Sequence, residues 1–277
     1  MDGILIINKP KGKTSHDVIN KLRKIYHQKK FGHSGTLDPQ AEGVLIVLCG
    51  KACKVLQFLN DTDKVYQSSI QVGFSTDTDD IYGNKLEEKE INHNFDFEEV
   101  LKTFEGHQHQ MVPMTSAKKI NGKKLLDYQR EGKEIQPVFT DIEIYSIHPL
   151  DDTSLSFEIS CSSGTYVRSV CRDFGFKTNN LACMKSLKRI QVGRFTIDMA
   201  QYLIDLEKGE QPILYPISSV LEHIPRVDDV DIPSIYQGKH IHIDTPYDQI
   251  CIYDKNQPIA IYQRDHKDVF RSVRGLW

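Results

Sequence analysis

The stretch FGHSGTLDPQAEGVLIVLCG, Phe31–Gly50, decides the fold because it joins a bend-rich loop to a long apolar run. The continuous apolar residues 44–49 are typical of a strand buried on both faces of a sheet. Asp38 lies in the loop before this run, between glycines that allow a backbone or a ligand to approach closely. Because Pro39 disfavours a helix at Asp38 but suits the first turn of a following helix, Asp38 is either a helix cap or a catalytic nucleophile or base.

The rest of the chain alternates between patterns typical of strands and of helices. Strands are predicted at residues 3–8, 65–74, 154–161 and 189–197, and helices at 16–26, 51–60, 95–106 and 165–175. Ser15 is placed to cap the first of these helices. Beyond Pro225 only short β segments with turns follow, so a mixed α+β domain of residues 1–225 and a small β module of residues 226–277 are predicted.

The charge of the chain is unevenly distributed. The 277 residues carry a net charge of −3, but residues 1–59 hold ten basic and four acidic side chains. Residues 161–194 hold seven basic side chains and one acidic, so each segment has a net charge of +6, while residues 60–110 are acidic. Such an asymmetry can form a basic surface that binds phosphates, although scattered solvated lysines would give the same count.

The cysteines and the apolar runs limit the class of protein. The six cysteines form no CxxC pair, and only the spacing of Cys49 and Cys53 hints at a metal. Core or surface thiols in a reducing cytoplasm are therefore favoured over a metal site. The sequence has no secretory signal at MDGILIINKP and no apolar run of membrane-spanning length, which predicts a cytoplasmic protein without a membrane partner.

A second stretch, CSSGTYVRSV (Cys161–Val170), combines a strand end with a predicted helix start near Thr165. The free amides of such a start suit an anion such as a phosphate. Arg168, one turn into this helix, is either a surface charge or the partner of a buried carboxylate. In the β-rich run KVYQSS, Tyr66 is either a core aromatic or a platform for base stacking, and His33 is either a turn residue or a nucleic-acid contact.

Six motifs in the first 195 residues resemble those of the TruB family of tRNA pseudouridine synthases. They are INKPKGKTS (Ile7–Ser15), GHSGTLDPQAEGVL (Gly32–Leu45), KVYQSSIQVGFSTDTDDIYG (Lys64–Gly83), SAKKINGKKLLDYQREG (Ser116–Gly132), CSSGTYVRSVCRDFG (Cys161–Gly175) and LKRIQVGRF (Leu187–Phe195). One motif alone would be weak support, whereas six in family order are specific. The resemblance implies the pseudouridine synthase fold, with a mixed, mainly antiparallel central sheet flanked by helices, and a shortened PUA-like module at residues 226–277.

The resemblance also implies a reaction. The uridine at position 55 in the T-loop of tRNA would be flipped out of its stack and isomerised to pseudouridine, without a cofactor or a metal. Asp38 matches the catalytic aspartate, which must be ionised to act as a nucleophile toward the nucleotide or as a base at the ribose. The choice between these two roles stays open.

Five further residues match substrate-binding positions of the family. Arg168 matches the arginine that pairs with the catalytic aspartate and keeps it ionised in a water-poor pocket. Tyr66 matches the tyrosine that stacks on the target uracil, His33 the histidine that contacts the flipped region of the RNA, and Leu187 an apolar residue that lines the pocket. Lys9 lies beside the site in the first motif.

Two positions depart from the family pattern. Thr115 stands where a tyrosine is usual and Val112 where a proline is common, which affects the expected packing there rather than Asp38. Two alternatives to a stand-alone synthase are open. One is a synthase guided by a separate RNA, as in the related archaeal and eukaryotic branch, although the compact length and the start at Met1 favour action without a guide. The other is an RNA chaperone that binds and refolds tRNA.

Overall fold

The computed structural model describes residues 1–59, 63–133 and 135–277. By its internal contacts the chain divides into two units, of which unit 1 comprises residues 1–39, 44–60 and 198–277 and unit 2 comprises residues 40–43 and 61–197. Strand β3 (Glu42–Cys49), the buried strand predicted after the Asp38 loop, contributes its first two residues to unit 2 and the others to unit 1.

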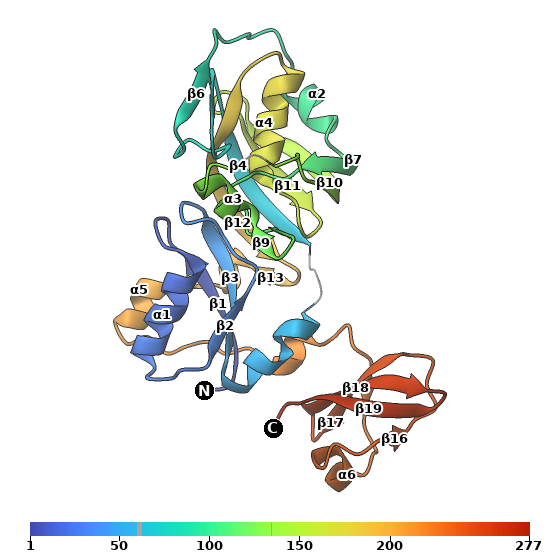
Figure 1. The fold of residues 1–277 in the computed structure, drawn as a ribbon. Coiled ribbons are helices and arrows are strands. Elements are labelled where there is room, and N and C mark those ends of the chain that lie inside the picture. Colours follow the sequence, from blue (N-terminus) through green and yellow to red (C-terminus); the bar gives the residue numbers. More distant parts are fainter. Residues whose placement is uncertain (60–62, 134) are drawn as a thin grey trace. The chain divides into compact units, whose positions relative to one another are not determined.

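The N-terminal part of unit 1 is built on a small sheet in which β1 and β2 pair with β3, and β14 pairs with β1. Besides β3, its elements are β1 (Gly3–Lys9), β2 (Phe31–Ser34), α1 (Ser15–Ile25) and α5 (Leu203–Glu207), which Figure 1 labels, and the short strand β14 (Gln201–Tyr202). Leu5 and Ile7 of β1 pack with Val18 and Leu22 of α1 in one buried apolar cluster. This core fixes α1 and the strands that lead into and out of the Asp38 loop.

The N-cap of helix α1 is Thr14 rather than the predicted Ser15. The Thr14 hydroxyl accepts a hydrogen bond from the Asp17 N–H at 3.0 Å, and the Asp17 carboxylate accepts one from the Thr14 N–H at 2.9 Å. This reciprocal pair is a capping box. The prediction for Ser15 is therefore wrong, because the adjacent threonine takes the capping position and leaves the serine hydroxyl available for another partner.

The helix predicted over residues 51–60 is a 3₁₀ helix, η1 (Gly50–Phe58). The carboxylate of Asp2 accepts a hydrogen bond from the Lys51 N–H at 2.7 Å, which satisfies an amide at the start of the helix. Asn60, the last residue of the prediction, lies outside the described residues.

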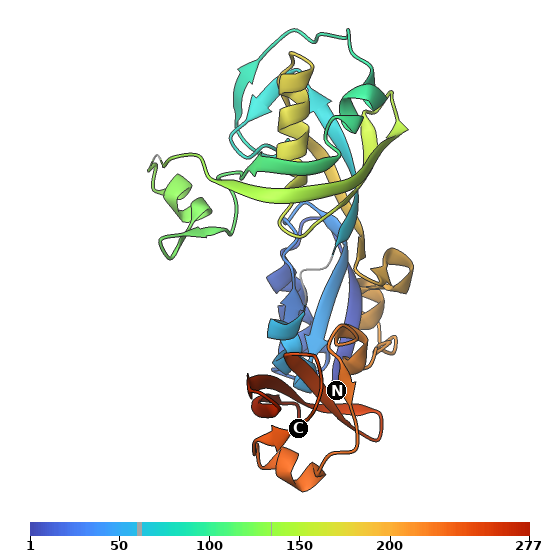
Figure 2. The same ribbon diagram turned by 90° about the vertical axis from the view of Figure 1, so that its right-hand side faces the viewer.

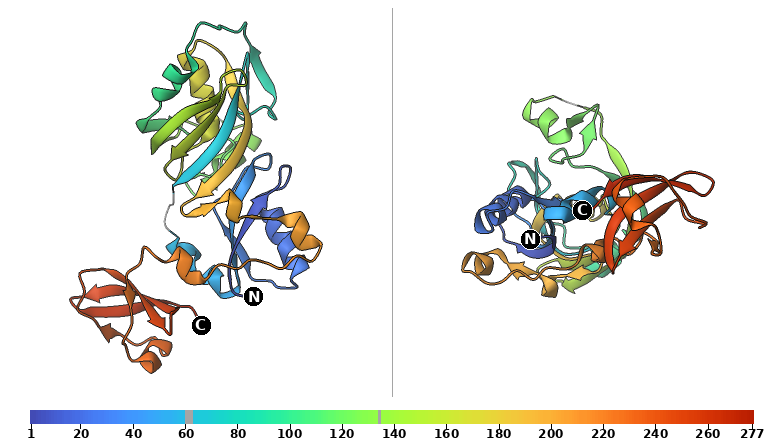
Figure 3. Two further views of the ribbon diagram at one scale, coloured as in Figure 1. Left: turned by 180° about the vertical axis from the view of Figure 1, so that it is seen from behind. Right: turned by 90° about the horizontal axis from the view of Figure 1, so that it is seen from below.

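Unit 2 contains a larger sheet with the strand order β12-β4-β11-β10-β7, in which all neighbours are antiparallel. Its strands are β4 (Lys64–Val72), β7 (Gly106–Met111), β10 (Phe139–Asp151), β11 (Ser156–Cys161) and β12 (Ala182–Val192). Helix α4 (Val167–Lys177) packs along β12 and β4, and α2 (Phe97–Lys102) packs on β10. Figure 3 shows the opposite face of this sheet, which α4 does not cover.

Several short elements complete unit 2. They are the hairpin β5 (Phe74–Thr76) and β6 (Lys85–Glu88), and the segment β8 (Lys119–Ile120), β9 (Lys123–Lys124) and α3 (Leu125–Arg130), which projects from the sheet in Figure 2. The single strand predicted over residues 189–197 is wrong. Strand β12 ends at Val192, Gly193 turns the chain with a φ of +53°, and β13 (Phe195–Thr196) folds back along β12.

The C-terminal part of unit 1 forms a five-stranded sheet in the order β15-β17-β18-β19-β16. Its elements are β15 (Arg226–Val227), α6 (Ile232–Tyr236), β16 (Ile241–His242), β17 (Gln249–Asp254), β18 (Gln257–His266) and β19 (Val269–Gly275), preceded by η2 (Ile197–Met199) and η3 (Ile217–Val220). Ile235, Ile252 and Phe270 belong to the buried cluster of this sheet. The division at residue 225 stays a prediction.

The prediction of an α+β fold is confirmed. Among the strand pairs whose directions are described, antiparallel pairs prevail, and β1–β14 and β3–β12 are parallel. Helices α1 and α4 pack on strands of their own units. The sheet is thus mixed and mainly antiparallel, with helices beside it.

Candidate active site

Asp38 lies in an irregular loop between β2 and β3. Pro39 and Gln40 form a turn directly after it, and the next regular element is strand β3. The helix-cap interpretation of Asp38 is therefore wrong, because no helix follows it in this described part of the chain. A half-buried carboxylate on a short loop between two strands is well placed for chemistry, since the strands limit how far the loop can move.

Lys9 binds the C-terminal side of this loop by a hydrogen bond from its side chain to Pro39. Its side chain is fully buried, and its Nζ donates hydrogen bonds to the carbonyl oxygens of Pro39 at 3.1 Å and Pro10 at 3.0 Å. A third bond from Nζ reaches the carbonyl oxygen of Lys13. A buried ammonium group requires such partners, and here one of them is the residue next to Asp38. Lys9 thus contacts the Asp38 loop, and its place beside a substrate site stays a prediction.

Two more residues of the first motif hold the same loop. The Leu37 N–H donates to the Ser15 hydroxyl at 3.0 Å, and the hydroxyl donates to the Leu37 carbonyl oxygen at 3.4 Å. The Gly12 N–H donates to the Pro39 carbonyl oxygen at 2.8 Å. The residues on both sides of Asp38 are thus fixed through their backbone groups.

Replacing Ser15 with alanine is expected to lower the free energy of unfolding by about 1–3 kcal/mol, because the buried Leu37 N–H would lose its partner. Urea unfolding of the variant measures this change. Ser154→Ala is the matched control, since its hydroxyl is exposed. A variant as stable as this control would contradict the role of Ser15.

Tyr66 and Leu187 lie on neighbouring strands and share one face of the unit 2 sheet. Tyr66 of β4 is paired with Arg189 of β12, and Ser68 of β4 is paired with Leu187 of β12. Cross-strand partners and alternate residues point to the same side, so these four side chains share a face. The Ser68 hydroxyl lies 3.9 Å from the sulfur of Cys171 in α4, which shows that α4 covers this face.

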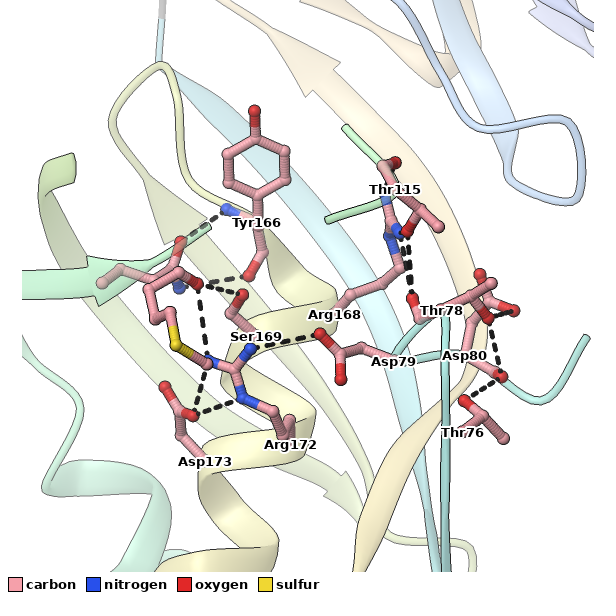
Figure 4. Close-up of polar contacts among 12 residues, drawn as sticks. Thr76, Thr78, Asp79, Asp80, Thr115, Tyr166, Arg168, Ser169, Arg172 and Asp173 are labelled. Atoms are coloured by element: carbon pink, nitrogen blue, oxygen red, sulfur yellow. Dashed lines mark hydrogen bonds and ion pairs between the residues drawn. The ribbon is translucent and has the colours of Figure 1, made fainter. Parts of the chain in front are cut away.

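Arg168 is buried rather than a surface charge, with 5% of its surface exposed. Its Nη1 donates to the Thr78 carbonyl oxygen at 3.0 Å and also to the Thr115 hydroxyl, and its Nη2 donates to the Thr115 carbonyl oxygen at 3.1 Å. Figure 4 shows the guanidinium group between these two threonines. The hydrogen bonds that the planar guanidinium group donates therefore fix the charged end of Arg168.

Helix α4 begins at Val167, two residues after the predicted start at Thr165. The amide of Tyr166, which precedes the helix, is not available to an anion, because its N–H donates to Oε1 of Gln110 at 2.8 Å. The Nε2 of Gln110 donates back to the Tyr166 carbonyl oxygen at 3.1 Å. Gln110 thus fixes the peptide before the helix, and Arg168 lies in the first turn rather than one turn in.

A second arginine of α4 ties this helix to the same loops. Arg172, one turn after Arg168, forms ion pairs with Asp79 at 3.1 Å and with Asp173 at 2.8 Å (Figure 4). Burial raises the pKa of Asp79, and the neighbouring charge of Arg172 opposes this shift. The Asp79 carbonyl oxygen also accepts from the Met184 N–H at 2.9 Å. Both the carboxylate and the carbonyl oxygen of Asp79 are therefore bound. These contacts fix the backbone next to Thr78, which accepts a hydrogen bond from Arg168.

His33 lies on β2, opposite Val47 of β3, and is partly exposed. In unit 1 the structure therefore brings together Lys9 and the loop of Asp38, which His33 precedes on β2. In unit 2 it brings together Tyr66, Leu187 and the helix that carries Arg168. The pairing of Arg168 with Asp38 stays a prediction.

A family model described as "TruB family pseudouridylate synthase (N terminal domain)" matches residues 23–167, which is more than half of the chain. The chain belongs to the TruB family. It is 41% identical to tRNA pseudouridine synthase B of Oceanobacillus iheyensis, with 99% of this chain and 97% of that protein covered. It is 34% identical to the protein of the same name from Streptococcus thermophilus, with 95% of both covered. This TruB-family protein is thus a pseudouridine synthase, an isomerase.

Solved structures show the same fold. The chain matches a Cbf5-Nop10-Gar1 complex with a TM-score of 0.73, over 100% of this chain and 85% of that one. It matches an H/ACA ribonucleoprotein bound to a substrate RNA containing 2′-deoxyuridine with a TM-score of 0.72, over 99% and 85%. Both are 21% identical to this TruB-family chain, so the likeness concerns the fold. It confirms the expected pseudouridine synthase fold.

The described part of this TruB-family chain has no helix that is long and apolar enough to cross a membrane. Within the same residues, no group of three or more His, Cys, Asp or Glu side chains is placed to hold a metal ion. Cys53, one of the two cysteines with ligand-like spacing, directs its sulfur to the Leu48 carbonyl oxygen at 3.2 Å.

Sequence reasoning missed four residues that support the site in this TruB-family structure: Gly12, Thr115, Gln110 and Asp79. Each acts on a partner far along the chain, such as Gln110 on Tyr166, 56 residues later. The family departure at Thr115 was a usable signal, because it marks a position whose contacts must differ from the usual ones. Gly12 and Asp79 lie within the motifs Ile7–Ser15 and Lys64–Gly83, which was also a usable signal, whereas Gln110 lies outside all six motifs.

Proposed function

We propose that this pseudouridine synthase acts on tRNA, isomerises the uridine at position 55 of the T-loop, and needs no guide RNA. One observation carries the proposal. The loop of Asp38 is anchored by the motif that contains Lys9 and Ser15, in a chain that matches the tRNA pseudouridine synthase B of Oceanobacillus iheyensis over 99% of its length. Catalysis by a carboxylate depends on its being held in a fixed position. Hydrogen bonds to the residues on both sides of Asp38 restrict its movement.

The proposed reaction rearranges the nucleotide without adding or removing a group. The N1–C1′ bond breaks, the uracil turns, and a C5–C1′ bond forms. The hydrogen at C5 leaves as a proton, and N1 gains a proton. Asp38 acts either as a nucleophile toward the nucleotide or as a base at the ribose, and both roles need its ionised form. Arg168, a fixed positive charge, would favour that form.

The remaining residues would hold the extruded nucleotide. A uridine in a folded loop does not offer C1′ to a protein carboxylate, so it must leave its stack at a cost of about a few kcal/mol. Tyr66 would stack on the uracil, and Leu187 would line the pocket. His33 would contact the region of the RNA from which the base is flipped out. The basic segments 1–59 and 161–194 would bind the phosphates of the T-arm.

Release of tritium from uracil C5 tests the function. A tRNA transcript that carries tritium at C5 of its uridines is incubated with the protein alone. We expect one tritium atom to reach the solvent per tRNA, because one C5 hydrogen is replaced at position 55. The control transcript, with cytidine at position 55, should release none.

Three outcomes of this experiment would contradict the proposal in different ways. Equal release from both transcripts would rule out position 55 as the target. Release only after a second RNA is added would show that a guide is needed. Binding of the transcript without any release would leave an RNA chaperone as the function.

A further inference from the structure

The guanidinium group of Arg168 donates hydrogen bonds to two segments of unit 2. Among its partners are the backbone carbonyl oxygens of Thr78 and Thr115 and the Thr115 hydroxyl. The carbonyl positions depend on the backbone alone. The hydroxyl is the contact that the identity of residue 115 determines, and a valine of the same shape would lack it.

The Thr115 hydroxyl is also directed by its other contact. It lies 3.4 Å from the Thr78 carbonyl oxygen, to which it can donate its single proton. With the proton used there, the hydroxyl oxygen can accept from Nη1 of Arg168, a contact that Figure 4 draws as a dashed line. The hydroxyl therefore accepts from Arg168 without having to rotate, and it links the two segments that hold the guanidinium group.

The surroundings of Thr78 make this arrangement rigid. The next residue, Asp79, is paired with Arg172 at 3.1 Å, and its carbonyl oxygen accepts from the Met184 N–H at 2.9 Å. Arg168 and Arg172 both belong to α4, so the helix and the loop are joined at two successive turns. A change at Thr115 would therefore act on the direction of Arg168 rather than on the position of the loop.

We propose that Thr115 is a positioning residue for the reaction: its hydroxyl fixes the direction of the guanidinium group of Arg168, whose charge favours the ionised form of Asp38 in the proposed function. The inference rests on the proposed function, in which Arg168 is the charge partner of Asp38. It assigns to Thr115 an effect on the rate of isomerisation and not on the binding of tRNA.

The variants Thr115→Val and Thr115→Ser separate this role from simple packing. Valine keeps the shape and removes the hydroxyl, whereas serine keeps the hydroxyl. We expect the single-turnover rate of tritium release to fall about tenfold or more for Thr115→Val, because a misdirected charged group loses most of its effect on the transition state. Thr115→Ser should stay within about threefold of the original rate, and the Kd for tRNA should stay within about twofold for both.

A double variant tests whether Thr115 acts through Arg168. Arg168→Lys keeps the charge but loses the planar fork, so it should be slow by itself. Adding Thr115→Val to Arg168→Lys should then change the rate less than twofold. If valine distorts the packing, which thermal unfolding would reveal, Thr115→Ala compared with Thr115→Ser isolates the hydroxyl in the same way.

The outcomes distinguish this inference from the proposed function. A normal rate for Thr115→Val beside a slow Arg168→Lys would overturn the role of Thr115 alone. An equal loss of rate from Thr115→Val with and without Arg168→Lys would show that Thr115 acts elsewhere, and would also overturn it. A normal rate for Arg168→Lys would show that the planar fork is not needed, which would overturn the role of Thr115 and leave the charge of Arg168 in the proposed mechanism.

Discussion

Replacing Asp38 with asparagine is expected to reduce pseudouridine formation by a factor on the order of 10³ or more, because the amide can act neither as a nucleophile nor as a base. The loop should keep its position, since backbone groups of Leu37 and Pro39 anchor it on both sides of Asp38 and asparagine has nearly the same shape as aspartate. The variant should therefore bind tRNA as the original protein does. Tritium release and filter binding of the same transcript measure the two properties separately.

The matched control for Asp38→Asn is Asp151→Asn, which removes the same charge at an exposed position in β10. This control should release tritium at the original rate. Turnover by Asp38→Asn at the rate of the control would rule out the proposed chemistry. If Asp38→Asn protein still accelerates the folding of tRNA, binding has a role that does not depend on catalysis.

The sequence predicted most regular elements because their signals are local. The apolar run before Cys49 predicted β3, and the spacing of Val18 and Leu22 predicted α1. Errors arose where two neighbouring residues can serve the same purpose, as with Thr14 and Ser15 at the cap of α1. The pairing of Thr14 with Asp17 is a capping box that the sequence displays three residues apart, so this error was avoidable.

The support of the site could not be predicted in the same way. The bond between Ser15 and Leu37 joins residues 22 positions apart, and that between Arg168 and Thr78 joins residues 90 positions apart. Such contacts depend on the tertiary fold, and no periodicity in one sequence encodes them. Burial of Lys9 even opposes the usual preference of lysine for the surface. The family motifs predicted the residues of the site, whereas the contacts that hold these residues came from the structure.

Gly43→Ala is expected to destabilise the protein by more than about 4 kcal/mol, an effect well above that of most single substitutions. Gly43 has a φ of +108°, which an L side chain rarely adopts. A Cβ atom there would lie 2.1 Å from the carbonyl oxygen of Arg189, its partner on β12. That atom belongs to the backbone, so the two strands would have to move apart. Arg189 is also the cross-strand partner of Tyr66, so activity should fall together with stability.

Urea unfolding of Gly43→Ala beside Gly209→Ala isolates the close contact from the unusual φ. Gly209 has a φ of +98°, but nothing lies within 4 Å of a Cβ built there. The control should therefore lose about 1–3 kcal/mol, the cost of the backbone conformation alone. The difference between the two variants reports how tightly β3 and β12 approach each other. Equal losses for both would show that the strands can separate without cost, and the close approach at Gly43 would then not stabilise the sheet.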